Sequence, residues 1–276
     1  MKKKNNDISV LLCVYNGDNA DFLRQAITSI LKQTLQPSEI IIIVDGYVNK
    51  KLQKVLSDYS NNSLFKIIFL KENLGVGPAR NEGLKYCSYD LVAIMDADDI
   101  MVENRLELQQ KEFNKDPKLK LLGGQIVEFK DNNIHHRAFS RIVPLSRDDI
   151  LRYARKASPF NNVTVMYRKS AVLKVGGYPP LNRGEDYCLY AKMLSDGCVA
   201  LNLSETLVYV RFDKNSLKRR KTWRHTKETI LAKKTIRDLG ICSNLDLLSF
   251  SLSRFIIFII PFPLMQWAYR RVRKNV

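Results

Sequence analysis

Short apolar runs alternate with segments of helical spacing through the N-terminal part of this chain. Continuous apolar runs, which suit strands covered on both faces, occupy residues 8–15, 39–44, 66–70 and 91–95. Helices are expected between and after them, at residues 22–33, 50–59 and 76–87. This alternation predicts an α/β fold with a doubly wound, mainly parallel sheet, in which ligands bind beyond the carboxyl ends of the strands.

The pattern is looser after Glu112, and it is least regular over residues 125–165. The expected elements are one long strand or a strand pair at 119–129, a strand at 163–167, helices at 169–175 and 185–194, strands at 199–203 and 206–212, and a helix at 216–239. Gly240 supplies the stop for the last helix. We therefore expect the body of the protein to end near residue 212, with a helical region after it.

Composition excludes several broad classes of protein. Of the 276 residues, 45% are hydrophobic and 26% are charged, which is globular composition and excludes a disordered chain. The five cysteines are scattered without a C-x-x-C pair, which argues against a disulfide framework or structural zinc and favours a reducing compartment. After the N-terminal lysines, Asn5, Asn6 and Asp7 precede an apolar stretch of strand length, so we interpret it as a buried strand and not as a signal peptide.

Positive charge is concentrated in the C-terminal quarter of the chain. The formal net charge is +17, and residues 207–276 hold 16 Lys and Arg against 4 Asp and Glu. Basic clusters at 218–221 and 270–274 flank an apolar run at 255–265, which at 11 residues is too short for the about 20 that span a bilayer. Cations and aromatic residues beside a short apolar segment are typical of an element that lies on an anionic membrane surface.

Two other interpretations of the basic region stay open. It can form a helix that packs against the body and exposes a solvated basic face. It can also bind nucleic acid, which is the weaker interpretation because the region carries no recognisable RNA- or DNA-binding motif.

Polar side chains follow the predicted parallel strands where each strand ends. Tyr15 and Asn16 follow the first strand, Asp45 follows the second, and Asp96 begins an acidic cluster after the fourth. A carboxylate at a strand end is often a turn residue, but several of them converge here on one edge of the sheet.

The acidic cluster is Asp96-Ala97-Asp98-Asp99. Carboxylates this close repel one another unless a cation joins them, and such oxygen ligands suit Mg²⁺ or Mn²⁺. A helix N-terminus is the alternative explanation.

Two further motifs begin predicted helices. The glycine-rich segment from Gly75 to Gly83 resembles a phosphate-binding turn, but Arg80 replaces the third glycine of a dinucleotide fingerprint. Glu185 and Asp186 follow Gly184 at the start of another helix and supply a candidate general base, separate from the metal site.

Seven motifs in order resemble the inverting family-two glycosyltransferases of the GT-A fold. They are ISVLLCVYNG, SILKQT, EIIIIVDG, GPARNEG, IMDADD, KVGGY and GEDYCLY, and the similarity covers residues 8–212. EIIIIVDG, together with LVYVRF and KRR, is most similar to bacterial exopolysaccharide, capsule and O-antigen transferases. The resemblance implies a nucleotide-sugar half at about 1–115 and an acceptor half at about 116–212. The charge distribution adds a basic helical region at 213–276, which is expected to associate with a membrane surface.

The resemblance also implies roles for individual residues. Asp186 is expected to be the catalytic base, with Glu185 beside it in the acceptor site. The residues expected to contact the nucleotide sugar are Val14, Tyr15, Asn16, Asp45, Gly75, Arg80, Asp96, Ala97 and Asp98. Among these, Tyr15 and Asp45 are expected to recognise uracil and Arg80 to lie near the phosphates. Asp98 and Asp99 are expected to hold the Mg²⁺ or Mn²⁺ ion.

Two positions depart from the family pattern. Val44 stands where an aspartate usually precedes Asp45, so recognition of the base rests on one carboxylate. Near Phe212 the chain lacks a histidine that is often found beside the diphosphate.

The implied activity is transfer of a sugar from a nucleotide sugar, expected to be a UDP-sugar, to a hydroxyl of a glycan acceptor with inversion. The acceptor is expected to be linked to polyprenyl diphosphate, and the enzyme to be cytoplasmic and peripheral on the inner face of the cell membrane. A nucleic-acid partner is not expected. The alternatives are an inactive nucleotide-sugar-binding scaffold and a basic nucleic-acid-binding protein.

Overall fold

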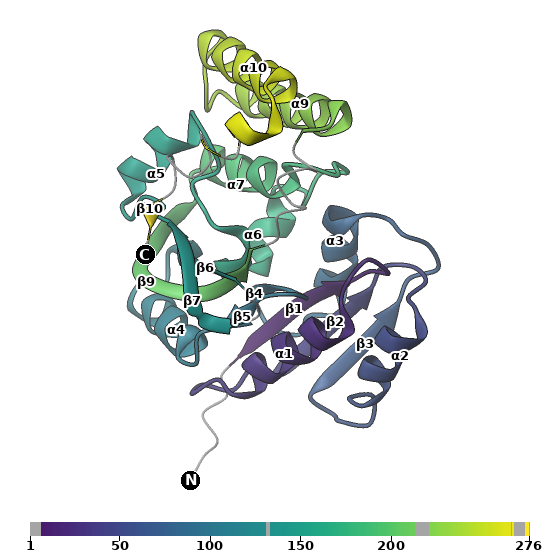
Figure 1. Cartoon of the computed structure of the whole chain (residues 1–276). Coiled ribbons are helices and arrows are strands. Elements are labelled where there is room, and N and C mark those ends of the chain that lie inside the picture. The colour runs from purple at the N-terminus through teal and green to yellow at the C-terminus, as the bar shows by residue number, and fades with distance from the viewer. Residues whose placement is uncertain (1–6, 131–132, 213–220, 266, 268–273, 276) are drawn as a thin grey trace.

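The computed structural model describes residues 7–130, 133–212, 221–265, 267 and 274–275. Its centre is one mixed sheet with helices on both faces, and two C-terminal helices lie at one end (Figure 1). The expected doubly wound α/β architecture is confirmed.

Four parallel strands form the N-terminal half of the sheet, in the order β3-β2-β1-β4. They are β1 (Ile8–Val14), β2 (Glu39–Val44), β3 (Phe65–Phe69) and β4 (Leu91–Asp96). Every residue of β2 is buried, because helices cover both faces of the strand. The carboxyl ends of β1, β2 and β4 therefore meet at one edge of the sheet, as the sequence predicted.

The second half of the sheet is mixed. Its strands are β5 (Ile100–Met101), β6 (Leu119–Lys130), β7 (Asn133–Arg141), β8 (Met166–Arg168), β9 (Val199–Arg211) and β10 (Lys274–Asn275). β8 is antiparallel to both β4 and β6, and β7 is antiparallel to β6. β9 runs parallel to β6 and also pairs with β5. The reversal at β8 joins the two halves into one sheet.

Two strand predictions were wrong. The two strands expected at 199–203 and 206–212 are one strand, β9. The strand expected at 163–167 is a 3₁₀ turn, η1 (Asn162–Thr164), followed by the short strand β8. The choice left open at 119–129 is settled as one long strand, β6.

Helices cover both faces of the sheet. One apolar cluster packs helices α1 (Ala20–Leu31), α2 (Lys50–Ser57) and α4 (Arg105–Lys115) against one face. A second cluster packs α3 (Val76–Tyr86), α5 (Arg147–Ala154), α6 (Lys169–Lys174) and α7 (Glu185–Ser195) against the other. The Asn19 side chain begins α1 by accepting hydrogen bonds from the backbone N–H groups of Asp21 and Phe22. The apolar spacing of the sequence did not predict α4 or α5.

The C-terminal region is a pair of helices, α9 (Trp223–Asp238) and α10 (Asn244–Ile259). The helix predicted at 216–239 begins later, after the Thr222 cap, and residues 216–220 lie outside the described part of the chain. α9 packs on α7 through a small apolar cluster that includes Cys188, Ala232 and Ile236. Among the described residues, no helix is both long enough and apolar enough to cross a membrane.

Candidate functional site

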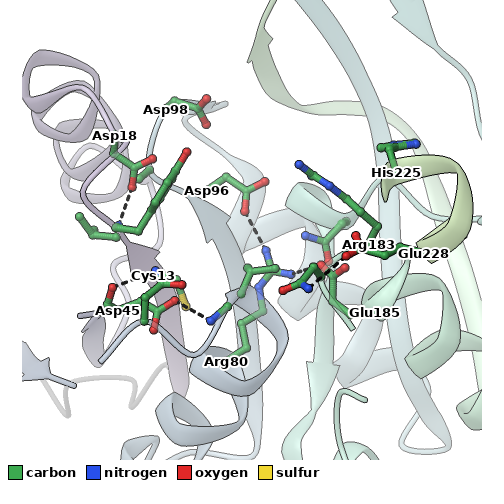
Figure 2. Close-up of a pocket in the computed structure, with 18 of the residues that line it drawn as sticks. Cys13, Asp18, Asp45, Arg80, Asp96, Asp98, Arg183, Glu185, His225 and Glu228 are labelled. Atoms are coloured by element: carbon green, nitrogen blue, oxygen red, sulfur yellow. Dashed lines mark hydrogen bonds and ion pairs between the residues drawn. The ribbon is translucent and has the colours of Figure 1, made fainter. Parts of the chain in front are cut away.

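A pocket of about 750 Å³ lies at the carboxyl ends of the parallel strands (Figure 2). Strand ends and turns of the N-terminal half form one side. The turn before α7 and the first part of α9 form the other side. This is the edge at which ligands bind in doubly wound sheets.

The end of β1 supplies Tyr15 to the pocket. Its ring is half-exposed, and its backbone N–H donates to Asp18 Oδ2 at 2.9 Å. A side chain at Gly17 would collide with this ring, since an added Cβ would lie 2.5 Å from Tyr15 Cε2. Burial raises the pKa of Asp18 to about 7, and the charges of Asp98 and Asp96 add to the shift. Asp18 also lines the pocket, although no motif in the sequence predicted it as a site residue.

The end of β2 supplies Asp45, which is almost fully buried. Its two carboxylate oxygens accept hydrogen bonds from the backbone N–H groups of Leu74 at 2.7 Å and Gly75 at 3.0 Å. Gly75 has a φ of +87° and begins α3, so a glycine is favoured there. Asp45 thus fixes the turn that precedes α3, and its recognition of a nucleobase stays a prediction.

The acidic cluster after β4 is divided between the pocket and the interior. Asp96, Ala97 and Asp98 line the pocket. Asp99 is buried, is not among the lining residues, and accepts a hydrogen bond from the Arg211 N–H at 2.9 Å. Burial, and then the charges of Asp98 and Asp96, raise the pKa of Asp99 well above its usual range. Its contact to β9 is a structural one, and its expected role as a metal ligand gains no support from the geometry.

Arg80 contacts carboxylates from both sides of the pocket, Asp96 after β4 and Glu185 at the start of α7. Only 4% of its side chain is exposed. Nη2 lies 2.9 Å from Asp96 Oδ1, and Nη1 lies 3.6 Å from Glu185 Oε1 (Figure 2). The guanidinium also lies 5.6 Å from the ring centroid of Tyr178. Arg80 lines the pocket as expected, but its charge is paired with these two carboxylates.

The start of α7 supplies Glu185 and Asp186. Gly184 precedes them with a φ of +75°, and an added Cβ there would lie 2.8 Å from Ala232 Cβ of α9. Glu185 lines the pocket, and its pKa is raised to about 7 by burial and then by the charge of Asp186. Asp186 is half-buried and is not among the lining residues. Burial raises the pKa of Tyr178, and the charge of Asp186 adds to that shift.

The remaining side of the pocket was not expected to take part. Its lining residues come from the turn before α7 and from α9: Asn182, Arg183, Thr222, Arg224, His225 and Glu228. Asn182 Nδ2 donates to Glu228 Oε1 at 3.2 Å, which ties the turn to the helix. The sequence predicted α9 but gave no signal for which of its faces meets the pocket.

The structure brings most of the predicted site residues together. Those that line the pocket are Val14, Tyr15, Asp45, Gly75, Arg80, Asp96, Ala97, Asp98 and Glu185. Those that do not are Asn16, Asp99 and Asp186. Asn16 instead accepts a hydrogen bond from the Asn49 N–H at 2.9 Å, which fixes the turn before α2.

The carboxylates fit a cation that arrives with a phosphate ligand. Among the described residues, no group of three or more His, Cys, Asp or Glu side chains is arranged to hold a metal ion alone. Mg²⁺ and similar ions commonly take one or two carboxylates and complete their shell with phosphate oxygens and water. Asp98 lines the pocket and can supply such a carboxylate, whereas Asp96 is paired with Arg80.

Comparison with protein families gives one matching domain. The model of the family described as glycosyl transferase family 2 matches residues 9–176. This range includes all of β1 except Ile8, the strands β2 to β4, the acidic cluster, and helix α3, which carries Arg80.

Two curated relatives match nearly the whole chain. The amylovoran biosynthesis glycosyltransferase AmsE of Erwinia amylovora is 32% identical, over 97% of this chain and 99% of its own. The UDP-Gal:alpha-D-GlcNAc-diphosphoundecaprenol beta-1,3-galactosyltransferase of Escherichia coli is 34% identical, over 96% of this chain and 95% of its own.

Solved structures share the fold at low sequence identity. The mannosyltransferase PcManGT of Pyrobaculum calidifontis, in complex with GDP-Man and Mn²⁺, has a TM-score of 0.64 at 15% identity, over 96% of this chain and 80% of its own. Residues 1–349 of S. aureus TarS, in complex with UDP-GlcNAc, give 0.59 at 20% identity, over 81% of this chain and 66% of that one. The expected GT-A fold is confirmed.

Proposed function

The chain belongs to glycosyl transferase family 2, and on that premise we propose that it transfers a sugar from a UDP-sugar, with inversion, to a hydroxyl of a glycan on polyprenyl diphosphate. The reaction would serve bacterial surface polysaccharide biosynthesis. The observation that carries the proposal is the pocket itself, which has Asp96 and Asp98 on one side and Glu185 on the other. Transfer needs this division, because the diphosphate departs on one face of the sugar and the acceptor attacks on the other.

The donor would lie on the side formed by β1, β2 and β4. Tyr15 offers an exposed ring on which a base can stack, and the acidic cluster lies at the next strand end. A divalent cation on Asp98 would neutralise charge on the departing diphosphate, and such stabilisation is commonly the largest catalytic contribution. The UDP-galactose donor of the E. coli relative supports a UDP-sugar here.

Asp186 would act as the general base. It stands in the first turn of α7, next to the pocket residue Glu185, and its charge acts on the buried Tyr178 and Tyr190. The Tyr190 hydroxyl accepts a hydrogen bond from the side-chain amide of Asn162, which lines the pocket. Glu185 is held by Arg80, which leaves Asp186 as the carboxylate available to accept the proton.

Replacement of Asp98 by Asn tests the cation site. We expect the variant to bind UDP in the presence of Mn²⁺ at least about ten-fold more weakly than the wild type, because a charged ligand of the ion is lost. Without Mn²⁺ the two proteins should bind UDP similarly. Calorimetric titration with and without the ion measures both differences. Equal dependence on Mn²⁺ in the two proteins would remove Asp98 from the cation site.

The acceptor is proposed from the two nearly full-length relatives. The E. coli relative is named for a diphosphoundecaprenol-linked acceptor, and the E. amylovora relative for the synthesis of a polysaccharide. A lipid-linked acceptor places the reaction at a membrane surface, so the enzyme needs a way to remain there. We place it in the cytoplasm, in peripheral contact with the inner face of the cell membrane.

The outer face of α10 is the proposed membrane contact. Large apolar side chains are exposed there with the three- and four-residue spacing of one helix face: Leu245, Leu248, Leu252, Phe255, Ile256 and Ile259. Two exposed lysines lie on the neighbouring helix α9, Lys227 and Lys234. A basic cluster at 218–221 precedes α9 in the sequence. Apolar side chains with cations beside them favour an anionic bilayer surface.

Charge on this face should prevent membrane binding. We expect the double variant Leu248→Glu/Leu252→Glu to lose at least about ten-fold in binding to phosphatidylglycerol vesicles, because two buried leucines contribute about 1.5–3 kcal/mol each. Flotation measures the bound fraction. Leu173→Glu, at an exposed leucine of α6, is the matched control and should bind like the wild type. Equal binding by all three proteins would reject the α10 contact.

The activity itself is tested by a screen of UDP-sugars with an alkyl diphospho-N-acetylglucosamine as acceptor. We expect UDP release that requires both acceptor and divalent cation. Binding of UDP-sugars without release or transfer would instead favour an inactive scaffold. Salt-dependent RNA or DNA binding that is unaffected by Asp98→Ala would favour a nucleic-acid-binding protein.

A further inference from the structure

The two sides of the pocket differ in charge. The strand side carries the carboxylates of Asp18, Asp45, Asp96 and Asp98 and the buried Arg80. The other side carries the guanidinium groups of Arg183 and Arg224 together with the carboxylates of Glu185 and Glu228. Figure 2 shows Arg183, His225 and Glu228 on one side of the pocket and Asp45 and Cys13 on the other, with Arg80 between them. Arginines on the acceptor side have no role in the proposed recognition of the nucleotide sugar.

Arg183 is available to bind an anion. Its side chain is exposed, and within the described residues its guanidinium makes neither a hydrogen bond nor an ion pair. It precedes Gly184 directly, so it stands immediately before the helix that begins with Glu185 and Asp186. The buried Arg80, in contrast, is already paired with two carboxylates.

Arg224 is held in place by its neighbour on α9. Its Nε donates to Glu228 Oε1 at 3.0 Å, and the same oxygen accepts from Asn182 Nδ2. Within the described part of the chain, the Arg224 Nη atoms make no hydrogen bond. The pair with Glu228 therefore positions the guanidinium and leaves its outer donors for a ligand.

The exposed apolar surface of α10 contacts the start of α9, which carries Arg224. Trp223, the residue before Arg224, is half-exposed, and its ring centroid lies 5.8 Å from those of both Phe255 and Phe258 on α10. Contacts thus lead from the apolar surface of α10 through Trp223 to Arg224, and from Arg224 through Glu228 and Asn182 to the turn with Arg183 that precedes Glu185 and Asp186. A lipid diphosphate sugar has the same order of hydrocarbon, anion and hydroxyl groups.

We propose that Arg183 and Arg224 bind the diphosphate of the lipid-linked acceptor and so select acceptors that carry one. This inference rests on the proposed function and names the residues that bind the phosphates of the acceptor. Arginine suits the task because its planar guanidinium makes paired, charge-assisted hydrogen bonds to phosphate oxygens. The site holds the acceptor so that its terminal sugar reaches Asp186.

The diphosphate of the donor is the other anion that these arginines could bind, so the test must fill the donor site first. With UDP and Mn²⁺ saturating, decyl diphosphate is titrated into the wild type and into Arg183→Gln, Arg224→Gln and the double variant. Arg152→Gln, at an exposed arginine of α5, is the matched control. Decyl glucoside measures binding that depends on the alkyl chain alone.

We expect the Kd of decyl diphosphate to rise about ten-fold or more in each single variant, because a charge-assisted hydrogen bond is lost, and to rise further in the double variant. Binding of UDP and Mn²⁺, binding of decyl glucoside and thermal stability should stay at their wild-type values. The Arg152→Gln protein should behave as the wild type in every titration.

Three results would overturn the inference. They are unchanged affinity for decyl diphosphate in the double variant, weaker binding of UDP in its place, and failure of the wild type to bind decyl diphosphate more tightly than decyl glucoside. A variant that unfolds is replaced by Arg183→Lys or Arg224→Lys, which keeps the charge and should weaken binding less than Gln. None of these measurements requires sugar transfer, so failure of the proposed function is seen separately, as absence of UDP release in the screen.

Discussion

Replacement of Asp186 by Asn is expected to lower the turnover number for sugar transfer by about 10²–10⁴-fold, which is the usual contribution of a positioned general base. Asparagine has nearly the same shape but cannot accept the acceptor's proton at neutral pH. Since Asp186 does not line the donor side of the pocket, the Kd of UDP with Mn²⁺ should stay unchanged. Steady-state rates of UDP release, together with a UDP titration, measure the two quantities.

Glu185→Gln is the matched control for this prediction. It removes the neighbouring carboxylate, which pairs with Arg80, and leaves Asp186 in place. We expect a smaller loss of turnover than in the Asp186 variant, because Glu185 positions groups and does not take the proton. Wild-type turnover in Asp186→Asn, together with an inactive Glu185→Gln, would make Glu185 the base.

Replacement of Arg80 by Met is expected to cost about 3 kcal/mol in the free energy of unfolding, the lower end of the range for breaking a buried ion pair. Asp96 and Glu185 would lose their shared partner, and the Asp96 side chain is 39% exposed, which moderates the penalty. Urea unfolding measures the loss. Arg24→Met removes the exposed pair with Asp58, whose side chains are 46% and 41% exposed, and should cost below about 1 kcal/mol.

The loss in Arg80→Met should grow as the pH rises. The Glu185 pKa is already raised to about 7, and Arg80 acts to lower it. Without Arg80 the pKa of Glu185 in the folded state rises further, while its pKa in the unfolded state stays near 4.5. At a pH above 4.5 the unfolded chain ionises this carboxyl more readily than the folded protein does, so the folded state is destabilised. The destabilisation should therefore be larger at pH 8 than at pH 5. A loss equal to that of Arg24→Met, or one that is independent of pH, would contradict the buried bridge.

The parallel half of the fold was predictable because its strands are buried on both faces. The residues of β2, from Glu39 to Val44, form a continuous run of apolar residues after one glutamate, and the predicted bounds are the observed ones. Both faces of such a strand contact helices, so no polar position interrupts the pattern.

The second half was less predictable because polar residues stand where pairing is irregular. In β9, Ser204 and Glu205 interrupt the apolar pattern and suggested two strands. The pairing shifts there, since Gly123 pairs with Asn202 and Gln125 with Thr206, so that three residues of β9 stand opposite Gly124. The strand bends without ending.

Helix α4 was not predicted, again because polar residues stand at buried positions. Its buried face includes Arg105 and Gln109, which are polar residues that the apolar spacing cannot reveal. Arg105 Nη2 donates to the backbone oxygens of Ile94 and Val165, and burial lowers its pKa to about 9. These bonds connect α4 to the strand that carries the acidic cluster.

The candidate site likewise contains residues that the sequence predicted and residues that it did not. Asp45, Asp96 and Asp98 were found from sequence because each follows a recognisable strand, and strand order places their ends together. Arg183 and Arg224 were not found, because their positions depend on how α9 packs against the start of α7. Tertiary packing of this kind leaves no periodic signal in the sequence.

The most direct test of the proposed mechanism is the configuration of the new linkage. In the proposed mechanism, Asp186 activates an acceptor hydroxyl that attacks from the face opposite the departing diphosphate, in a single displacement. Proton NMR of the product, made from an α-linked UDP-sugar such as UDP-galactose, reports the anomeric configuration. We predict a β-linked product, and an α-linked product would contradict the single displacement.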